Sequence, residues 1–391
     1  MSLPLVRTLA LGTAMVLSLP AGLQAAELSW SFQRVDAEPS PDATQLALGL
    51  GGGAQWPKVF YDKTPAGVGL KYLAAASLKP TGWSSTILSA AAIASPTSGF
   101  VGAASSSGGA GAVWRTGNSF QVAQFTASGW QVSTPGSTTS IAPVHRPSID
   151  YGPDGRAVIA YSNGTRLMVA GHDGSRWQND AVDLLGAAEN GYYPSIAVGS
   201  DGARHLVYRS ASQNRTYYAV HDLATGKWSK TELSGVPPVT AGNYSLAVNP
   251  NNVPSFACLR SSTLEFASFD TAAGAWDVTS LATGVDSTRV NLAFDGNGRA
   301  GLAFVSEGLV RLMLNDGGGW TTHTLPSGPA PLGTPKNNSE VALAFDADNL
   351  PVLAYYSNAG VILAYDPIVP EPATLVILAS VLSLAGRRRR R

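Results

Sequence analysis

The residues best suited to chemistry are polar and aromatic side chains that stand just before short apolar runs. They are His145, Arg146, Tyr192, Tyr193, Asn243, Tyr244, Arg289 and Glu340. Guanidinium, carboxylate and aromatic groups together can hold a saccharide or a peptide through charge-assisted hydrogen bonds and ring contacts. We interpret the set as a binding surface. The simpler alternative is that each residue caps a polar loop.

Catalytic and metal-binding patterns are weak in comparison. The histidines show no ligand spacing, and they are His145, His172, His205, His221 and His323. Asp295–Gly298 and Asp346–Asn349 resemble the opening of a calcium loop but lack its closing Glu, so we interpret them as turns. Cys258 is the only cysteine, which excludes an intramolecular disulfide and suggests a buried thiol. We predict no metal and no cofactor.

The elements that must position these residues form a repeat. Its clearest copy, Tyr193–Leu233, reads as four short strands separated by Gly, Asn and Asp turns. The first two strands recur with endings at Tyr161, Cys258, Phe304 and Tyr355. Weaker copies end at Tyr61 and lie near 91–104. One such sheet cannot bury both of its faces, so the copies must pack against one another.

Tryptophans give an independent count of the repeats. Each fourth strand opens with a Trp, at Trp83, Trp130, Trp177, Trp228, Trp276 and Trp320. The last copy stops before its own Trp, and Trp30 near the start of the chain supplies the missing one. Trp56 and Trp114 fall outside this series, and we interpret them as packing residues rather than exposed stacking platforms.

This arrangement predicts an all-β, seven-bladed β-propeller of four-stranded antiparallel blades, in which an N-terminal strand completes the last blade. The expected blades are roughly 43–89, 90–140, 145–188, 192–238, 243–285, 289–328, and 340–366 with 27–36. Six or eight blades are the alternatives, because the region 90–128 is rich in Gly, Ser and Ala. The residues before each inner strand would then surround one mouth of the central channel.

The blades resemble those of bacterial sialidase-like, or BNR-type, propellers. The pieces that carry the resemblance are PSIAVGSDGARHLVY, GLKYLAAAS and the Trp series. The resemblance implies a scaffold and carries no activity. A sialidase would need three convergent arginines, whereas only Arg146 and Arg289 stand at equivalent places before first strands.

The two ends of the chain read as export signals. Residues 1–26 combine Arg7, an apolar stretch and small residues, which predicts a secretory signal peptide. Residues 369–391 contain Pro370-Glu371-Pro372, an apolar run over 373–386, and the basic cluster Arg387, Arg388, Arg389, Arg390 and Arg391. The apolar run predicts a short hydrophobic helix, and the arginines would keep its end in the cytoplasm.

The C-terminal segment closely resembles the PEP-CTERM sorting signal of Gram-negative bacteria that make exopolysaccharide. The resemblance covers about 22 residues, and its three parts occur in the expected order. It implies processing by an exosortase near Pro370, Glu371 and Pro372, after Sec-type export and transient anchoring in the inner membrane. Delivery to the cell surface or the extracellular matrix would follow. An ordinary C-terminal tail anchor is the alternative, but it leaves the Pro-Glu-Pro unexplained.

The net charge of the exported domain limits which classes of molecule it can bind. The chain has 26 basic and 26 acidic residues, but without Arg7 and the five terminal arginines only 20 basic ones remain. The exported domain is therefore mildly acidic, which argues against nucleic acid. We expect a non-enzymatic module that binds polysaccharide or envelope proteins. The alternative is a glycoside hydrolase or lyase that acts at the channel mouth through residues such as Arg289 and Glu340.

Overall fold

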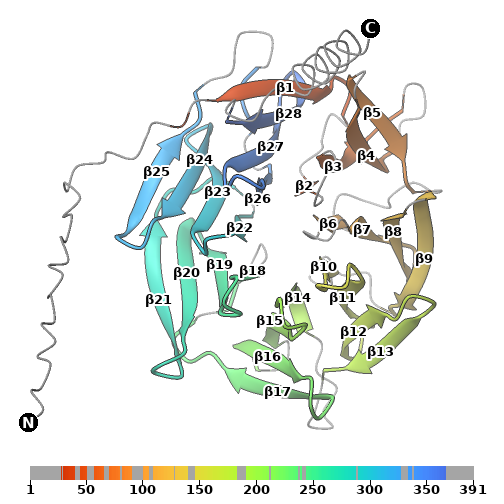
Figure 1. Cartoon of the computed structure of the whole chain (residues 1–391), viewed down its shortest axis with the longest axis vertical. Helices are drawn as coiled ribbons and strands as arrows, with labels where there is room; N and C mark the ends of the chain where they lie inside the picture. The colour runs from red at the N-terminus through yellow and green to blue at the C-terminus, as the bar shows by residue number, and fades with distance from the viewer. Residues whose placement is uncertain are drawn as a thin grey trace, which may run out of the picture.

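A computed structural model shows seven four-stranded antiparallel sheets arranged as a ring (Figure 1). The structure describes residues 28, 30–39, 45–50, 57–65, 70–79, 82–89, 100–104, 109–126, 128–139, 146–182, 191–210, 213–236, 238–239, 244–287, 289–326, 333–336 and 339–366. The prediction of a seven-bladed propeller is confirmed. The signal peptide and the sorting segment lie outside the described residues. Those residues include no helix long and apolar enough to cross a membrane.

Each blade follows the chain from an inner to an outer strand. Blade 1 comprises β2 (Leu46–Gly49), β3 (Lys58–Lys63), β4 (Tyr72–Lys79) and β5 (Gly82–Ile87). Blade 2 comprises β6 (Phe100–Ala104), β7 (Ala110–Thr116), β8 (Ser119–Thr126) and β9 (Gly129–Ser137). Blade 3 comprises β10 (Ser148–Tyr151), β11 (Ala157–Ser162), β12 (Leu167–His172) and β13 (Trp177–Ala181). Blades 4 and 5 comprise β14 (Gly191–Val198), β15 (Arg204–Ser210), β16 (Thr216–Asp222) and β17 (Lys227–Glu232), then β18 (Ser245–Val248), β19 (Pro254–Arg260), β20 (Thr263–Asp270) and β21 (Ala275–Ala282). Blade 6 comprises β22 (Asn291–Phe294), β23 (Ala300–Ser306), β24 (Leu309–Asn315) and β25 (Trp320–Thr324), and blade 7 joins β26 (Val341–Phe345), β27 (Pro351–Ser357) and β28 (Gly360–Tyr365) to β1 (Ser31–Asp36).

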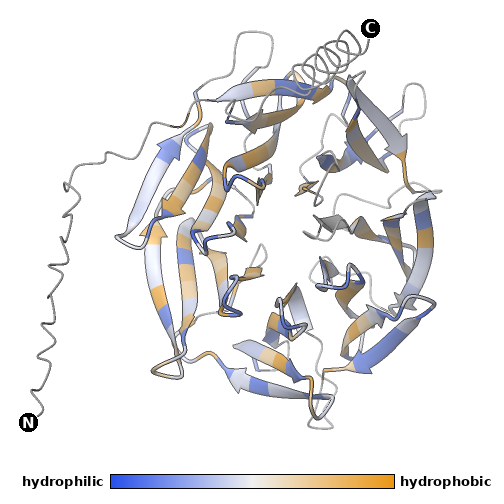
Figure 2. Ribbon diagram, viewed as in Figure 1, coloured by the Kyte–Doolittle hydropathy of each residue, from blue (hydrophilic) through white to orange (hydrophobic). Residues whose placement is uncertain are grey.

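Burial changes from the inside of a blade to its rim. The second strands β11 and β27 are buried along their whole length, because both of their faces pack against neighbouring blades. The outer strands β13 and β25 are largely exposed and carry more polar residues (Figure 2). Apolar runs therefore become middle strands, whereas Ser- and Thr-rich segments become the rim.

The core is divided into seven clusters, one between each pair of adjacent blades. The Trp that opens each outer strand packs against the blade before it; Trp130, for example, joins the cluster of blades 1 and 2. Trp30 does the same between blades 6 and 7. The Trp series thus marks the interfaces between adjacent blades. Trp114 is fully buried between blades 1 and 2, as the packing interpretation predicted.

Ring closure depends on β1, which pairs antiparallel with β28. Ser31 lies opposite Tyr365, and Asp36 lies opposite Val361. Without β1, the edge of β28 would expose unpaired backbone groups. The predicted closure by the N-terminal strand is confirmed.

Blade 2 departs from the expected placement of its first two strands. β6 covers the end of the weak copy near 91–104, whose residues 91–99 lie outside the described residues, and β7 follows at Ala110–Thr116. Gly109 and Gly111 lie so close to the ring of Tyr151 in blade 3 that an added Cβ would meet it within 2.7 Å or less. Glycines at these two positions therefore leave room for a tyrosine of the next blade, and Gly111 also leaves room for the Ala123 carbonyl of its own blade.

Candidate functional site

One repeat position gathers charged groups at a mouth of the ring. It lies just before the inner strand, two residues before the first paired residue in blades 3 and 6 and one residue before it in blade 7. It carries Arg146 in blade 3, Arg289 in blade 6 and Glu340 in blade 7. Glu340 Oε1 lies 2.8 Å from Arg289 Nε and 3.6 Å from Arg146 Nη1. We call these three residues the mouth triad. Long arginine side chains let blades far apart in the sequence share one carboxylate.

Blade 1 also contacts the mouth triad. The Leu46 N–H donates to Glu340 Oε2 at 3.3 Å, which joins the start of β2 to blade 7. All three side chains of the triad are mostly buried, with exposed fractions of 18% for Arg146, 11% for Arg289 and 10% for Glu340. The carboxylate is therefore held by charge and by a backbone donor in a partly desolvated site.

The other residues expected at the mouth have different surroundings. Tyr193 has a left-handed backbone, with φ of 53°, and is nearly buried, whereas Tyr192 is half-buried. Tyr244 borders the channel, but its ring is buried between blades 4 and 5 and its hydroxyl is hydrogen-bonded to Thr216 Oγ1 at 2.8 Å. His145 and Asn243 lie outside the described residues. The binding role of the whole set stays a prediction.

A further arginine, Arg209, joins this face from the end of β15. Its guanidinium carbon lies 5.9 Å from the centre of the Tyr192 ring, and its Nη1 donates to the Val239 carbonyl at 3.0 Å. Burial raises the pKa of Tyr193, while the charges of Arg209 and Arg146 oppose that rise. Arg209 was not among the predicted mouth residues, because that prediction used the positions before first strands and Arg209 lies near the end of a second strand. The usable signal was its place directly after Tyr208, at the end of a second strand.

Below the mouth, a channel of about 1090 Å³ follows the inner strands to the opposite face. Its lining runs from Glu340 and Arg289 to the turn at Asp346–Asn349. Hydroxyl groups join neighbouring inner strands along it: the amides of Ile196, Leu246 and Leu292 donate to Ser148, Ser195 and Ser245 at 3.1, 3.0 and 2.9 Å. These bonds satisfy backbone groups on the free edges of the inner strands, so the Ser of the repeat connects the inner strands of neighbouring blades.

Burial shifts the protonation of the mouth triad. It raises the pKa of Glu340 to about 7, while the Arg146 charge and the Leu46 N–H oppose the rise. It lowers the pKa of Arg146, and the carboxylates of Glu340 and Asp62 oppose that change. A carboxyl group whose pKa burial raises toward neutral pH has a property that general acids and bases need.

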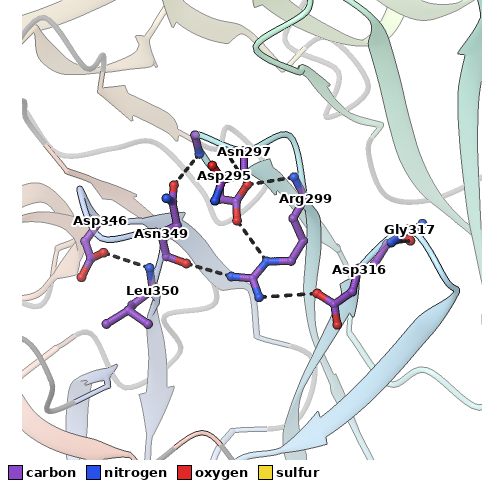
Figure 3. Close-up of polar contacts among 10 residues, drawn as sticks. Asp295, Asn297, Arg299, Asp316, Gly317, Asp346, Asn349 and Leu350 are labelled. Carbon is purple, nitrogen blue, oxygen red and sulfur yellow. Dashed lines mark hydrogen bonds and ion pairs between the residues drawn. The ribbon is translucent and has the colours of Figure 1, made fainter. Parts of the chain in front are cut away.

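On the opposite face, the turns between first and second strands connect blades. Asn349 Oδ1 of blade 7 accepts the Gly296 N–H of blade 6 at 2.7 Å. The Asn349 backbone carbonyl accepts from Arg299 Nη2 at 2.8 Å, and Figure 3 shows these two residues facing each other. Arg299 also reaches Asp295 Oδ2 at 3.0 Å. Asp295 and Asp346 use their Oδ1 atoms to accept amides of their own turns. The two calcium-like segments therefore form turns, as interpreted from the sequence.

Cys258 and the described histidines belong to packed or outer positions. Cys258 is buried, and burial raises the pKa of its thiol to about 12, so it is not a nucleophile at neutral pH. His205 is buried beside Tyr218, with Nδ1 and the hydroxyl 2.6 Å apart. His172 and His221 pack edge-on against Trp177 and Trp228 of the same blades.

Comparison with known proteins places the fold and leaves the function open. No protein-family model matches the chain, and no curated protein matches it in sequence. The polysaccharide lyase Uly1 matches with a TM-score of 0.52 at 10% identity, over 82% of this chain and 89% of the lyase. A triple arginine mutant of AofleA from Arthrobotrys oligospora matches with a TM-score of 0.51 at 10% identity, over 78% and 91% of the two chains.

A third similar structure is an α-L-arabinanase from Penicillium chrysogenum in complex with arabinobiose. It has a TM-score of 0.46 and 14% identity, over 68% of this chain and 92% of that one. At such identities, the likeness to solved structures shows the propeller fold alone.

Proposed function

We propose that the protein is an exported, surface- or matrix-associated propeller that binds acidic polysaccharide at the channel mouth without converting it. The observation that carries the proposal is the mouth triad, in which two guanidinium groups from different blades already hold one carboxylate. A carboxylate of a ligand can use the same donors, because Arg recognises carboxylates through paired N–H groups. Arg209 extends the basic character of this face.

The direction in which the strands of blade 7 run supports attachment of the protein to the cell surface or matrix. β26 leaves the mouth at Glu340, and β28 runs in the same direction, so Tyr365 lies on the opposite face. Burial raises the pKa of Asp346, a turn residue of that face, and the negative charge of Asp366 adds to the rise. Ser31 pairs with Tyr365, so both chain ends leave the ring away from the mouth. A tail that anchors the protein would then leave the mouth facing outward.

Sorting by an exosortase is the second half of the proposal. It rests on the Pro370-Glu371-Pro372 motif, the apolar run and the terminal arginines. Replacing these three residues with alanines should leave the protein in the inner membrane fraction. Unchanged release to the surface or the matrix would refute this half without affecting the binding half.

Binding is tested with the protein purified after export, on a glycan array that holds acidic and neutral polysaccharides. We expect saturable binding to acidic glycans, weakened at least about tenfold in Arg289→Gln or Arg146→Gln. Arg176→Gln is the matched control, because that arginine is exposed beside Asp173 at the rim of blade 3. Binding that is equal in all four proteins would refute the proposal. A preference for envelope proteins over glycans would also refute it.

A carbohydrate-active enzyme is the second candidate, favoured by the pKa of Glu340 near 7. In that case, soluble saccharide products should appear in the same incubations. Glu340→Gln would abolish product formation while leaving glycan binding in place. The absence of products from every glycan that binds would refute this candidate.

A further inference from the structure

The middle of the channel wall is made of small residues at one repeat position, with a single exception. In register, this position carries Gly49, Ala103, Ala197, Ala247, Ala293 and Ala344 in six blades, whereas blade 3 carries Asp150. Asp150 and the alanines of blades 4 to 7 line the channel. At this level the carboxylate stands beside alanines of the other inner strands. The polar lining residues Ser148, Ser195, Ser245 and Asn291 stand two residues earlier on their strands.

The surroundings of Asp150 leave its charge without a cation. Its Oδ2 accepts the Val198 N–H of blade 4 at 2.7 Å, and the Tyr151 backbone supplies a second hydrogen bond. Burial raises the pKa of Asp150 to about 6, and only those two backbone groups oppose the rise. Within the part of the chain that the structure describes, no Arg or Lys forms an ion pair with it.

An ionised carboxylate in such a place gains most from a positively charged partner. Removing a charge from water is costly unless it is paired and hydrogen-bonded. A hydroxyl group of a sugar would add one neutral hydrogen bond, whereas an ammonium group would add a charge-assisted one. The side chain is only partly exposed, and its exposed part faces the channel.

We propose that the channel is a second binding subsite, in which Asp150 holds a primary ammonium group of the ligand, as in an amino sugar with a free amine. The subsite deepens the proposed binding function and partly rests on it. Asp150 lies four residues along the chain from Arg146, or roughly 13 Å at the rise of an extended strand. The two subsites together would select a saccharide chain that carries a carboxylate and, about that far away, an amine.

The test compares a short oligomer of glucosamine with its fully N-acetylated counterpart, by calorimetry at neutral pH on the exported protein. We expect the free amine oligomer to bind and the acetylated one to bind at least about tenfold more weakly. Asp150→Asn should lose that preference. Since an Asn oxygen can still accept the Val198 N–H, the thermal stability of this variant should stay near that of the wild type.

A relocation control separates charge from shape. Asp150→Ala gives blade 3 the residue of blades 2 and 4 to 7, and adding Ala293→Asp returns a carboxylate to the same level of the channel. We expect the single variant to lose binding of the amine and the double variant to regain part of it.

Equal binding of both oligomers by the wild type would overturn the inference, as would unchanged binding by Asp150→Asn. Failure of the mouth is distinguishable from failure of this subsite. Arg289→Gln should impair acidic glycans and spare the short glucosamine oligomer. If acidic glycans do not bind but Asp150-dependent binding of the amine remains, the mouth proposal fails and the channel subsite stands.

Discussion

Replacing Glu340 by Gln should change how the stability of the propeller depends on pH. Burial raises the pKa of Glu340 to about 7 from its ordinary value of 4.5. The folded state then binds the proton more tightly than the unfolded state. The free energy of unfolding should therefore fall as pH rises from about 4.5 through about 7. Gln carries no titrating proton, so the variant lacks this contribution.

The magnitude follows from the size of the shift. A difference of about 2.5 pK units corresponds to about 3 kcal/mol of unfolding free energy. Glu340 is only 10% exposed, so solvent screening reduces this value little. Relative to the Gln variant, the wild type should lose about 3 kcal/mol between pH 4.5 and pH 8. Below pH 4.5 the unfolding free energies of the two proteins should change with pH in parallel.

Urea unfolding followed by tryptophan fluorescence at a series of pH values measures this difference. Titrating groups shared by the two proteins cancel when their free energies are subtracted. Glu307→Gln is the control for loss of a carboxylate at the surface, because Glu307 is 78% exposed beside Arg311. A flat difference for Glu340→Gln would refute the reasoning. It would mean that Arg146 and Arg289 keep the carboxylate ionised throughout.

Three further outcomes are expected. Asn349→Gly keeps the left-handed backbone, with φ of 64°, but loses the hydrogen bond to the Gly296 N–H, so the free energy of unfolding in urea should fall by about 1 kcal/mol. Asn349→Ala should lower it further, because Ala disfavours the left-handed backbone. Deleting residues 28–36 exposes the edge of β28, so the protein should open and self-associate, which gel filtration would reveal as larger species. Cys258 should resist thiol reagents at pH 8 until the protein is unfolded in urea, since its thiol is buried with a pKa of about 12; rapid labelling of the native protein would contradict this.

The sequence by itself predicted seven blades, with six or eight as alternatives, and the way the ring closes; the structure confirmed seven. Alternating apolar runs and Gly, Asn and Asp turns define strands locally, because strand period and turn geometry depend on a few neighbouring residues. Each outer strand must fill the space between its blade and the preceding one, so a Trp recurs at its start. The seventh copy has no Trp of its own, which pointed to Trp30. Blade 2 was hard to place because glycine is a poor strand signal; Gly109 and Gly111 leave room for Tyr151 of the next blade, and Gly111 also leaves room for the Ala123 carbonyl of its own blade.

Only the tertiary structure decided which charged residues meet. Arg146 and Arg289 come from blades 3 and 6, and the closed ring brings both to Glu340. Nothing in their sequence spacing encodes that contact, because it depends on side-chain reach across a channel. The isolation of Asp150 likewise appears only when seven inner strands are set in register around the same space. The repeat specifies the scaffold through local preferences, whereas the site arises where its copies differ from one another.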